Sequence, residues 1–295
     1  MSIRTILWPT DFSDDSRHAL DHAAAIARWY SARIVALHAF SPVYAEVPVL
    51  AGSGGDNDGF GTSAGIYTQL RDEIALPTIG IATTVDVVES AAAPAIVQYA
   101  AQHGIDLIVI GTHGTSGFEH LLLGSVTEKV LRRSLCPVLT VPPRARKTSS
   151  LPFKRIVCST DFSASSIAAM ETAVSFAQEG DAKLTIVHVL EDADENELFV
   201  ARPYDVHHHR ELREQHLREL VDSIVPPALR EWTTPSLVIA SGKAYQEILR
   251  VAGEQSADLI VMGVQGRTPF DVMMFGSTTN QVVRRATCPV LTVRT

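Results

Sequence analysis

The sequence predicts an α/β protein made of two tandem copies of one domain, each with an open parallel five-stranded sheet flanked by helices. Three observations predict this class. Segments of the chain repeat in the same order, and short apolar runs alternate with amphipathic helical patterns in each copy. The apolar runs also lack the polar alternation expected of strands with one face in water. The length of 295 residues is about twice a common domain length of ~100 to 200.

Three short segments carry the internal repeat, and each occurs once in either half of the chain. They are Thr-Asp-Phe-Ser at 10–13 and 160–163, Asp-Leu-Ile-Val at 106–109 and 258–261, and Cys-Pro-Val-Leu-Thr-Val at 136–141 and 288–293.

The stretch that joins the two copies reads Pro-Pro-Arg-Ala-Arg-Lys-Thr-Ser-Ser. Its prolines, small polar residues and positive charges are typical of an exposed linker. We therefore expect a first domain at 1–141, a linker at 142–151 and a second domain at 152–295.

Each copy contains five apolar runs that we expect to be strands. In the first copy they are Ile3 to Trp8, Arg33 to Phe40, Ile81 to Val88, Leu107 to Ile110 and Val138 to Val141. In the second copy they are Ile156 to Cys158, Leu184 to Leu190, Leu237 to Ala240, Leu259 to Met262 and Val290 to Val293. Helices are expected between the strands of the first copy at Ser16 to Trp29, Ala95 to Gln102 and Ser125 to Arg133.

The copies differ most between their second and third strands. The first has a glycine-rich stretch at 51–65, which we expect to be a loop, and the second has an acidic run at 191–197 and a helical pattern from about 207 to 224. With strand order 3-2-1-4-5, a ligand would bind beyond the carboxyl ends of the first and fourth strands, where the strand order reverses.

Composition and charge exclude several classes of protein. The 46% of hydrophobic and 20% of charged residues are typical of a globular chain. The formal charge of −8 has the wrong sign for holding nucleic acid by its phosphates. The sequence has no signal-peptide core and no apolar stretch of the ~18 residues that a membrane helix needs. Three cysteines cannot form a disulfide framework, so we expect a cytoplasmic protein that binds neither nucleic acid nor membrane.

A spaced glycine motif, G-x-x-G-x₉-G-S, is the strongest functional signal, because it occurs twice at matching places. The first glycine ends the expected fourth strand, and the Gly-Ser pair opens the next helix. Glycine lets backbone approach a ligand closely, and amide groups at a helix start favour an anion such as a phosphate chain. The motif comprises Gly111, Gly114, Gly124 and Ser125 in the first copy and Gly263, Gly266, Gly276 and Ser277 in the second.

Asp11 and Asp161 stand just after the first strand of each copy, on the same rim as the glycine motif. A triphosphate would repel a carboxylate placed directly against it. The favourable partners of these residues are therefore a ribose hydroxyl, the edge of a base, or a phosphate-bound Mg²⁺. The alternative is that they cap the following helix, although Ser13 and Ser163 are also available as caps.

These motifs resemble those of tandem universal stress proteins. The resemblance rests on Pro-Thr-Asp-Phe-Ser at the exit of the first strand, on Leu37-His38 and Val187-His188 at the end of the second strand, and on the doubled glycine motif. It implies a Rossmann-like sheet of the adenine nucleotide alpha hydrolase-like type, a dimer-like pairing of the two halves, and binding of ATP or another adenine nucleotide.

The resemblance also implies two ligand sites. The first would use Asp11, Ala39, Gly111, His113, Gly114, Gly124 and Ser125, and the second Asp161, Val189, Gly263, Gln265, Gly266, Gly276 and Ser277. Ala39 would pack an adenine less fully than Val189, and Gln265 stands where the first copy has His113. Arg267 is either a phosphate ligand or a solvated side chain. We therefore expect unequal affinities.

The sequence contains no recognisable catalytic arrangement, so the expected function is an ATP-binding stress-response regulator whose occupancy changes conformation or association. Two alternatives remain open: a slow Mg²⁺-dependent ATPase in which Asp11 or Asp161 holds the metal, and an interaction scaffold with empty crevices. His38 and His188 are expected to be structural. The histidines at 207–209 and His216 do not favour a metal site, because no second ligand pair has suitable spacing.

The last expected strand of each half, with the sequence Cys-Pro-Val-Leu-Thr-Val, is apolar and would lie at an edge of its sheet. An uncovered apolar edge is prone to pair with other strands. Pairing between the two halves, or with a second chain, would remove it. We therefore expect intramolecular pairing of the domains and a homodimer.

Overall fold

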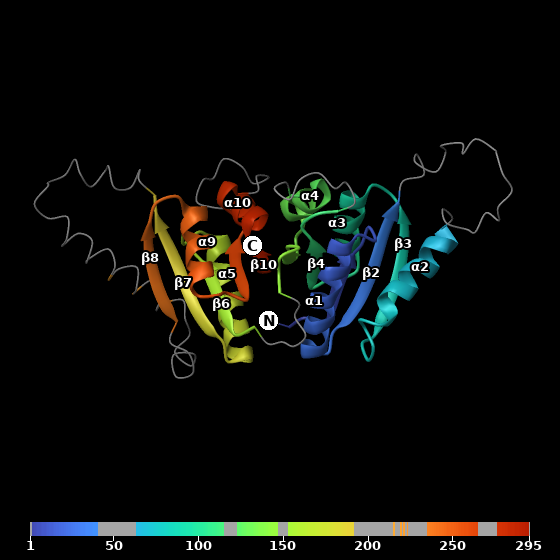
Figure 1. Cartoon of the computed structure of the whole chain (residues 1–295), viewed down its shortest axis with the longest axis horizontal. Coiled ribbons are helices and arrows are strands. Elements are labelled where there is room, and N and C mark those ends of the chain that lie inside the picture. Colours follow the sequence, from blue (N-terminus) through green and yellow to red (C-terminus); the bar gives the residue numbers. More distant parts are fainter. Residues whose placement is uncertain are drawn as a thin grey trace, which may run out of the picture. The chain divides into compact units, whose positions relative to one another are not determined.

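The computed structural model describes residues 2–40, 63–114, 123–146, 153–191, 235–264 and 276–294, together with residues 215, 219, 221 and 223. The chain divides into two compact units, Ser2–Ser150 and Leu151–Thr295, which we call the N-terminal and C-terminal units. Each unit is a parallel sheet flanked by helices (Figure 1).

The N-terminal unit has five strands in the order β3-β2-β1-β4-β5, and all of its pairs are parallel. The predicted order 3-2-1-4-5 is confirmed. Its elements are β1 (Thr5–Pro9), α1 (Asp14–Tyr30), β2 (Arg33–Phe40), α2 (Ser63–Ala75), β3 (Thr83–Glu89), α3 (Ala92–Gln102), β4 (Leu107–Gly111), α4 (Ser125–Arg133) and β5 (Val138–Val141).

The C-terminal unit repeats this order as β8-β7-β6-β9-β10, again with parallel pairs. Its elements are β6 (Arg155–Ser159), α5 (Ala164–Gly180), β7 (Lys183–Leu190), β8 (Ser236–Ser241), α9 (Ala244–Glu254), β9 (Leu259–Gly263), α10 (Ser277–Arg285) and β10 (Val290–Val293). Most of the helix expected near 207–224, nearly all of the acidic run and nearly all of the glycine-rich stretch lie outside the described residues.

The central strands β1 and β4 are buried along their whole length, which explains their continuous apolar sequences. Ile6 of β1 pairs with Ile34 of β2 on one side and with Leu107 of β4 on the other. The buried indole of Trp8 donates a hydrogen bond of 2.8 Å to the carbonyl of Ser16. This bond holds the first turn of α1 close to the end of β1, where the strand order reverses.

The helix α2 was not predicted from the sequence. Only Leu70 and Ile74 of its 13 residues are buried, so the apolar period that identifies a helix is weak there. The guanidinium of Arg28 in α1 donates a hydrogen bond of 2.6 Å to the carbonyl of Pro77. This bond connects the segment just after α2 to α1.

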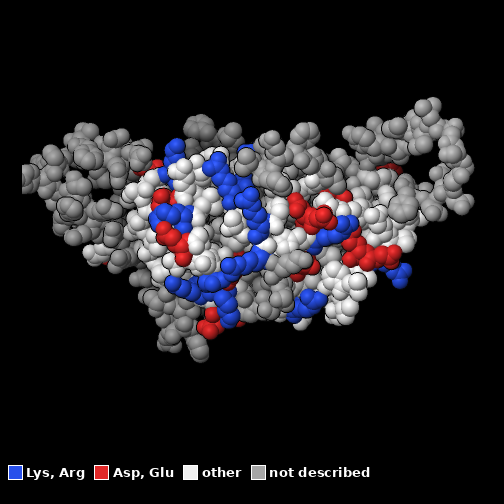
Figure 2. Space-filling model, viewed as in Figure 1, with Lys and Arg blue, Asp and Glu red and all other residues white. Residues whose placement is uncertain are grey.

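Charged side chains lie on the surface, and many are paired with the opposite charge. Arg250 of α9 is 2.7 Å from carboxylate oxygens of both Glu247 and Glu254. Figure 2 shows acidic and basic side chains next to one another in several places on the described surface. Exposed pairs contribute only ~0 to 1 kcal/mol each, so burial of apolar surface is the main stabilising term. In the part of the chain described, no helix has the length and apolarity needed to cross a membrane.

Candidate functional site

A cavity of about 240 Å³ lies in the N-terminal unit at the carboxyl ends of β1, β2 and β4. This is the place where the strand order reverses, as expected for a ligand site in an open parallel sheet. Every residue predicted for the first site lines the cavity: Asp11, Ala39, Gly111, His113, Gly114, Gly124 and Ser125.

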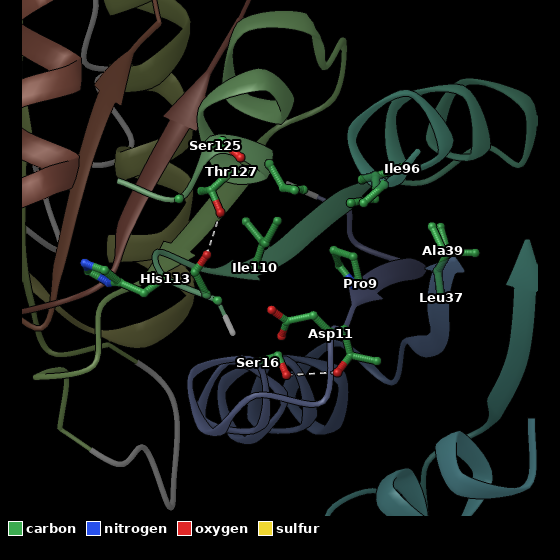
Figure 3. Close-up of a pocket in the computed structure, with 16 residues that line it drawn as sticks. Pro9, Asp11, Ser16, Leu37, Ala39, Ile96, Ile110, His113, Ser125 and Thr127 are labelled. Carbon is green, nitrogen blue, oxygen red and sulfur yellow. Dashed lines mark hydrogen bonds between the residues drawn. The ribbon is translucent and has the colours of Figure 1, made fainter. Parts of the chain in front are cut away.

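The cavity has an apolar end and a polar end. Figure 3 shows Leu37, Ala39 and Ile96 on one side, and Ser125 and Thr127 on the other. The apolar end is built by the end of β2 and by α3, and the polar end is the start of α4. Such a cavity suits a ligand that has a flat apolar part at one end and a negatively charged group at the other.

The polar end is the N-terminus of α4, where Gly124 is the N-cap and its helix receives no side-chain cap. The first amides of a helix have no intrahelical acceptor, and the helix dipole makes this end electropositive. The hydroxyl of Thr127 donates a bond of 2.8 Å to the carbonyl of Gly111. This bond holds the start of α4 against the end of β4. The electropositive helix start is therefore fixed at the edge of the cavity.

Two backbone amides beside this end are already bonded within the protein. The amide of Thr112 donates to the carbonyl of Val141, and the amide of Gly124 donates to the carbonyl of Thr112 over 2.7 Å. The amides of the first turn of α4, at Ser125 to Thr127, have no acceptor within the helix and are donors that an anion would meet there.

Gly111 lies where the first turn of α1 packs on the end of β4. A Cβ atom there would lie 2.9 Å from the backbone oxygen of Asp15, in the first turn of α1. Glycine thus allows α1 to pack directly on the end of β4, a role that the sequence did not suggest, and the expected close approach of a ligand stays a prediction. Gly263 repeats this, because its Cβ would lie 2.8 Å from the backbone of Ser165 and Ser166 in α5.

Asp11 forms a turn at the mouth of the cavity and does not cap α1. One carboxylate oxygen accepts from the amide of Ser13 at 3.1 Å and from its hydroxyl at 2.5 Å. Ser13 is the N-cap, and its own oxygen accepts from the amide of Ser16. The other oxygen of Asp11 lies so close to Gly114 that a Cβ atom there would be 2.5 Å away. A side chain at position 114 would therefore displace the carboxylate of Asp11 from its present position.

The side chain of His113 is directed away from Asp11 (Figure 3). Its Nδ1 atom lies 2.9 Å from the hydroxyl of Thr112, and its buried Nε2 atom has no hydrogen-bond partner among the described residues. A ligand beside Asp11 would meet the backbone of His113 sooner than its ring.

Glu73 of α2 is a titratable group near the cavity that the sequence did not suggest. Its side chain is 11% exposed, and its Oε2 atom lies 3.7 Å from Nε of Arg17. Burial raises the pKa of Glu73 above its ordinary value, while the charges of Arg17 and Asp11 act on it in opposite directions. It was missed because α2 itself was missed.

Comparison with known proteins assigns the family of the chain. Residues 2–142 and residues 152–294 each match the Universal stress protein family. The chain belongs to this family.

Relatives of single-domain length match about half of the chain. Universal stress protein MJ0531 of Methanocaldococcus jannaschii is 33% identical over 147 residues, which are 47% of this chain and 81% of that protein. Universal stress protein YxiE of Bacillus subtilis is 29% identical over 148 residues, which are 48% of this chain and 99% of that protein.

A solved structure matches nearly the whole chain. The crystal structure of a universal stress protein from Archaeoglobus fulgidus covers 98% of this chain and 96% of its own, with a TM-score of 0.65 and 22% identity. This likeness supports the α/β fold, as the sequence predicted.

The C-terminal unit of this universal stress protein contains the same backbone framework. Asp161 accepts from the amide and hydroxyl of Ser163, at 3.0 and 2.6 Å. The amide of Gly276, the N-cap of α10, donates to Val264 at 3.0 Å, and α10 begins at Ser277. Val189 lies near the end of β7, where it is partly exposed. Gln265, Gly266 and Arg267, predicted for this site, lie outside the described residues.

Thr127 and Thr279 are site residues that the sequence analysis missed. The hydroxyl of Thr279 donates a hydrogen bond of 2.9 Å to the carbonyl of Gly263, as the hydroxyl of Thr127 does to the carbonyl of Gly111. The signal was available, because both copies read Gly-Ser-x-Thr. Leu37 and Ile96 were also missed, since an apolar residue of a pocket has the same pattern as one of the core.

No group of three or more His, Cys, Asp or Glu side chains is arranged to hold a metal ion within the described residues. The histidines at 207–209 and His216 lie outside them.

Proposed function

We propose that the N-terminal unit binds an adenine nucleotide, ATP, in the cavity at the carboxyl ends of β1, β2 and β4. The C-terminal unit would bind a second nucleotide on the equivalent framework. In this proposal the protein is a cytoplasmic stress-response regulator, and nucleotide occupancy changes its conformation or association. The observation that carries the proposal is the cavity with one apolar end and one uncapped helix start.

Each part of the nucleotide has a matching wall in the cavity. The adenine would pack between Ala39 and Ile96, and the phosphates would lie at the first turn of α4. Hydrogen bonds to a charged group contribute ~1.5 to 3 kcal/mol each, which favours a phosphate over a neutral group at this helix start.

Among the described residues, Asp11 is the only carboxylate that lines this cavity. A single exposed carboxylate fits either a ribose hydroxyl or a Mg²⁺ ion that keeps most of its waters and bridges phosphates. The residues present are therefore compatible with a magnesium nucleotide. When bound, Mg²⁺ would neutralise phosphate charge, and Asp11 would hold it at the mouth of the cavity.

The two sites would differ in affinity. Val189 offers more apolar surface to an adenine than Ala39 does, and the second copy has Arg267 where the first has Thr115. As a phosphate ligand, Arg267 would strengthen binding at the second site. Calorimetry with MgATP should therefore resolve two classes of site when both are occupied.

Replacing Ser125 with Asp tests the proposal in the first site. Ser125 is exposed at the first position of α4, where a negative charge stabilises a helix by ~0.3 to 1 kcal/mol. The same charge would repel a phosphate, so we expect the affinity for MgATP to fall at least about tenfold while the Tm stays equal or rises. Ser125→Asn is the matched neutral control, and Ser277→Asp is the same change in the second site.

Isothermal titration of all these variants with MgATP reads out both sites. Equal affinity of wild type and Ser125→Asp, with Ser277→Asp also unchanged, would rule out binding of phosphate at the helix starts. Absence of heat with millimolar MgATP would reject nucleotide binding altogether and leave the scaffold alternative.

Regulation by association needs a separate measurement. We propose that the apolar edges formed by the final strands of the units take part in pairing, between the units or between two chains. Light scattering after size exclusion, with and without MgATP, should show a change in mass or hydrodynamic radius. Identical elution in both conditions would contradict regulation by association or large conformational change.

A further inference from the structure

His38 contacts the chain immediately before the Asp11 turn. It lies on β2, and its Nδ1 atom is 2.8 Å from the carbonyl oxygen of Thr10. A carbonyl oxygen only accepts hydrogen bonds, so Nδ1 carries the hydrogen. The side chain of His38 thus holds Thr10, the residue directly before Asp11, in place.

His38 also contacts the chain immediately after Asp11. The ring centroids of His38 and Phe12 are 4.6 Å apart. Phe12 has a φ of 64°, in the left-handed region that an aromatic residue rarely adopts. Its amide donates to the hydroxyl of Thr10 at 3.0 Å. The turn that presents Asp11 is therefore strained, and His38 holds it on both sides.

The same arrangement occurs in the C-terminal unit. Nδ1 of His188 is 2.8 Å from the carbonyl oxygen of Thr160, and the ring centroids of His188 and Phe162 are 5.2 Å apart. Phe162 has a φ of 60°, and its amide donates to the hydroxyl of Thr160 at 3.1 Å. The two copies have kept this geometry although the next residue on the strand, Ala39 or Val189, has changed.

We infer that His38 and His188 are positioning residues that hold the carboxylates of Asp11 and Asp161 at the ligand sites. The inference rests on the proposed function, since it assigns a ligand contact to each aspartate. The next residue on the strand, Ala39, lines the apolar end of the cavity. His38 therefore links the wall for the base to the carboxylate for the ribose or Mg²⁺.

Two variants separate the hydrogen bond from the packing. In His38→Asn the amide nitrogen takes the place of Nδ1 and can still donate to Thr10, whereas His38→Leu fills space without a donor. We expect MgATP to bind His38→Leu about tenfold more weakly and His38→Asn within about threefold of wild type. His103→Leu is the control, because Nδ1 of His103 makes a similar bond of 3.0 Å to the carbonyl of Tyr99, at the exposed C-terminal end of α3.

A double-mutant cycle with Asp11→Asn distinguishes positioning from a general structural role. If His38 acts through Asp11, His38→Leu weakens binding in the wild type and changes it less than about twofold in the Asp11→Asn background. An equal loss in both backgrounds, or a lower Tm with unchanged affinity, would overturn the inference.

A measurement without ligand keeps this test separate from the proposed function. The ¹³C chemical shifts of Phe12 report whether its backbone stays left-handed. We expect these shifts to move toward the values of a residue with negative φ in His38→Leu and to keep their wild-type values in His38→Asn. If the wild type bound no nucleotide, the proposed function would fail, and these shifts would still decide the role of His38. Unchanged Phe12 shifts in His38→Leu would refute it.

Discussion

Replacing Gly111 with Ala should destabilise the N-terminal unit by forcing α1 away from the sheet. The new Cβ would lie 2.9 Å from the backbone oxygen of Asp15, whereas ordinary contacts begin near 3.4 Å. Because the obstacle is helix backbone, α1 must move by about 0.5 Å or the end of β4 must shift. Overpacking of this kind typically costs ~1 to 3 kcal/mol.

Thermal and urea unfolding of the full chain measure this cost. For a unit of this size a loss of 1 kcal/mol lowers the Tm by about 2 to 4 °C, so we expect a decrease of about 2 to 12 °C. Gly253→Ala is the control, because a Cβ there meets nothing within 4 Å and the residue lies inside α9. It should be neutral or stabilise by ~0.5 to 1 kcal/mol.

A Gly111→Ala protein with wild-type Tm would refute this reasoning, because it would mean that α1 does not press on β4. If that protein had also lost nucleotide binding, Gly111 would have the role that the sequence suggested, in which its backbone approaches the ligand directly.

Three further predictions concern groups whose pKa is shifted by burial. Burial raises the pKa of Glu73, so the stability that its protonated carboxyl contributes to the folded state is complete below the unfolded pKa of ~4.3 and is lost as the pH rises through the raised pKa. Glu73→Gln should therefore gain stability relative to wild type in urea unfolding as the pH rises above the unfolded pKa, and parallel curves would contradict this. His22 is buried, and burial lowers its pKa. The stability that the neutral imidazole contributes is therefore present above the unfolded pKa of ~6.5 and is lost as the pH falls through the lowered value. The urea midpoint should fall on acidification, and it should fall less in His22→Gln. Burial raises the pKa of Cys158 and of Cys288 to about 12. Both thiols should therefore react with iodoacetamide at pH 8 only in denaturant, and mass spectrometry counts the labels. Rapid labelling of the native protein would contradict this burial.

The strands and their order could be predicted because the central strands are buried on both faces. Their apolar runs have clear limits, and the strands at Arg33–Phe40, Val138–Val141 and Val290–Val293 were predicted to the residue. Other limits were less accurate, because β1 and β3 each begin two residues later than expected, and the largely exposed α2 was not expected at all.

The positions of the site residues could also be predicted, but the reasons for them could not. Spacing placed Gly111 and Gly124 at the cavity, whereas only coordinates reveal that Gly111 faces Asp15 and that the amide of Gly124 is already bonded. Hydrogen bonds between residues far apart in the chain leave no periodic trace in the sequence. The bond from His38 to Thr10 is one of them, and it was anticipated only as a structural role.

The two bonds that join the start of α4 to the end of β4 do not involve residues 115–122 between them. Thr127 reaches Gly111 and Gly124 reaches Thr112, and α10 is joined to β9 in the same way. The first turns of α4 and α10 are therefore each anchored to the end of the neighbouring strand by described residues on either side of the connecting segment. A change of sequence within that segment replaces none of the four bonding groups, so the two halves can diverge there and still keep these bonds.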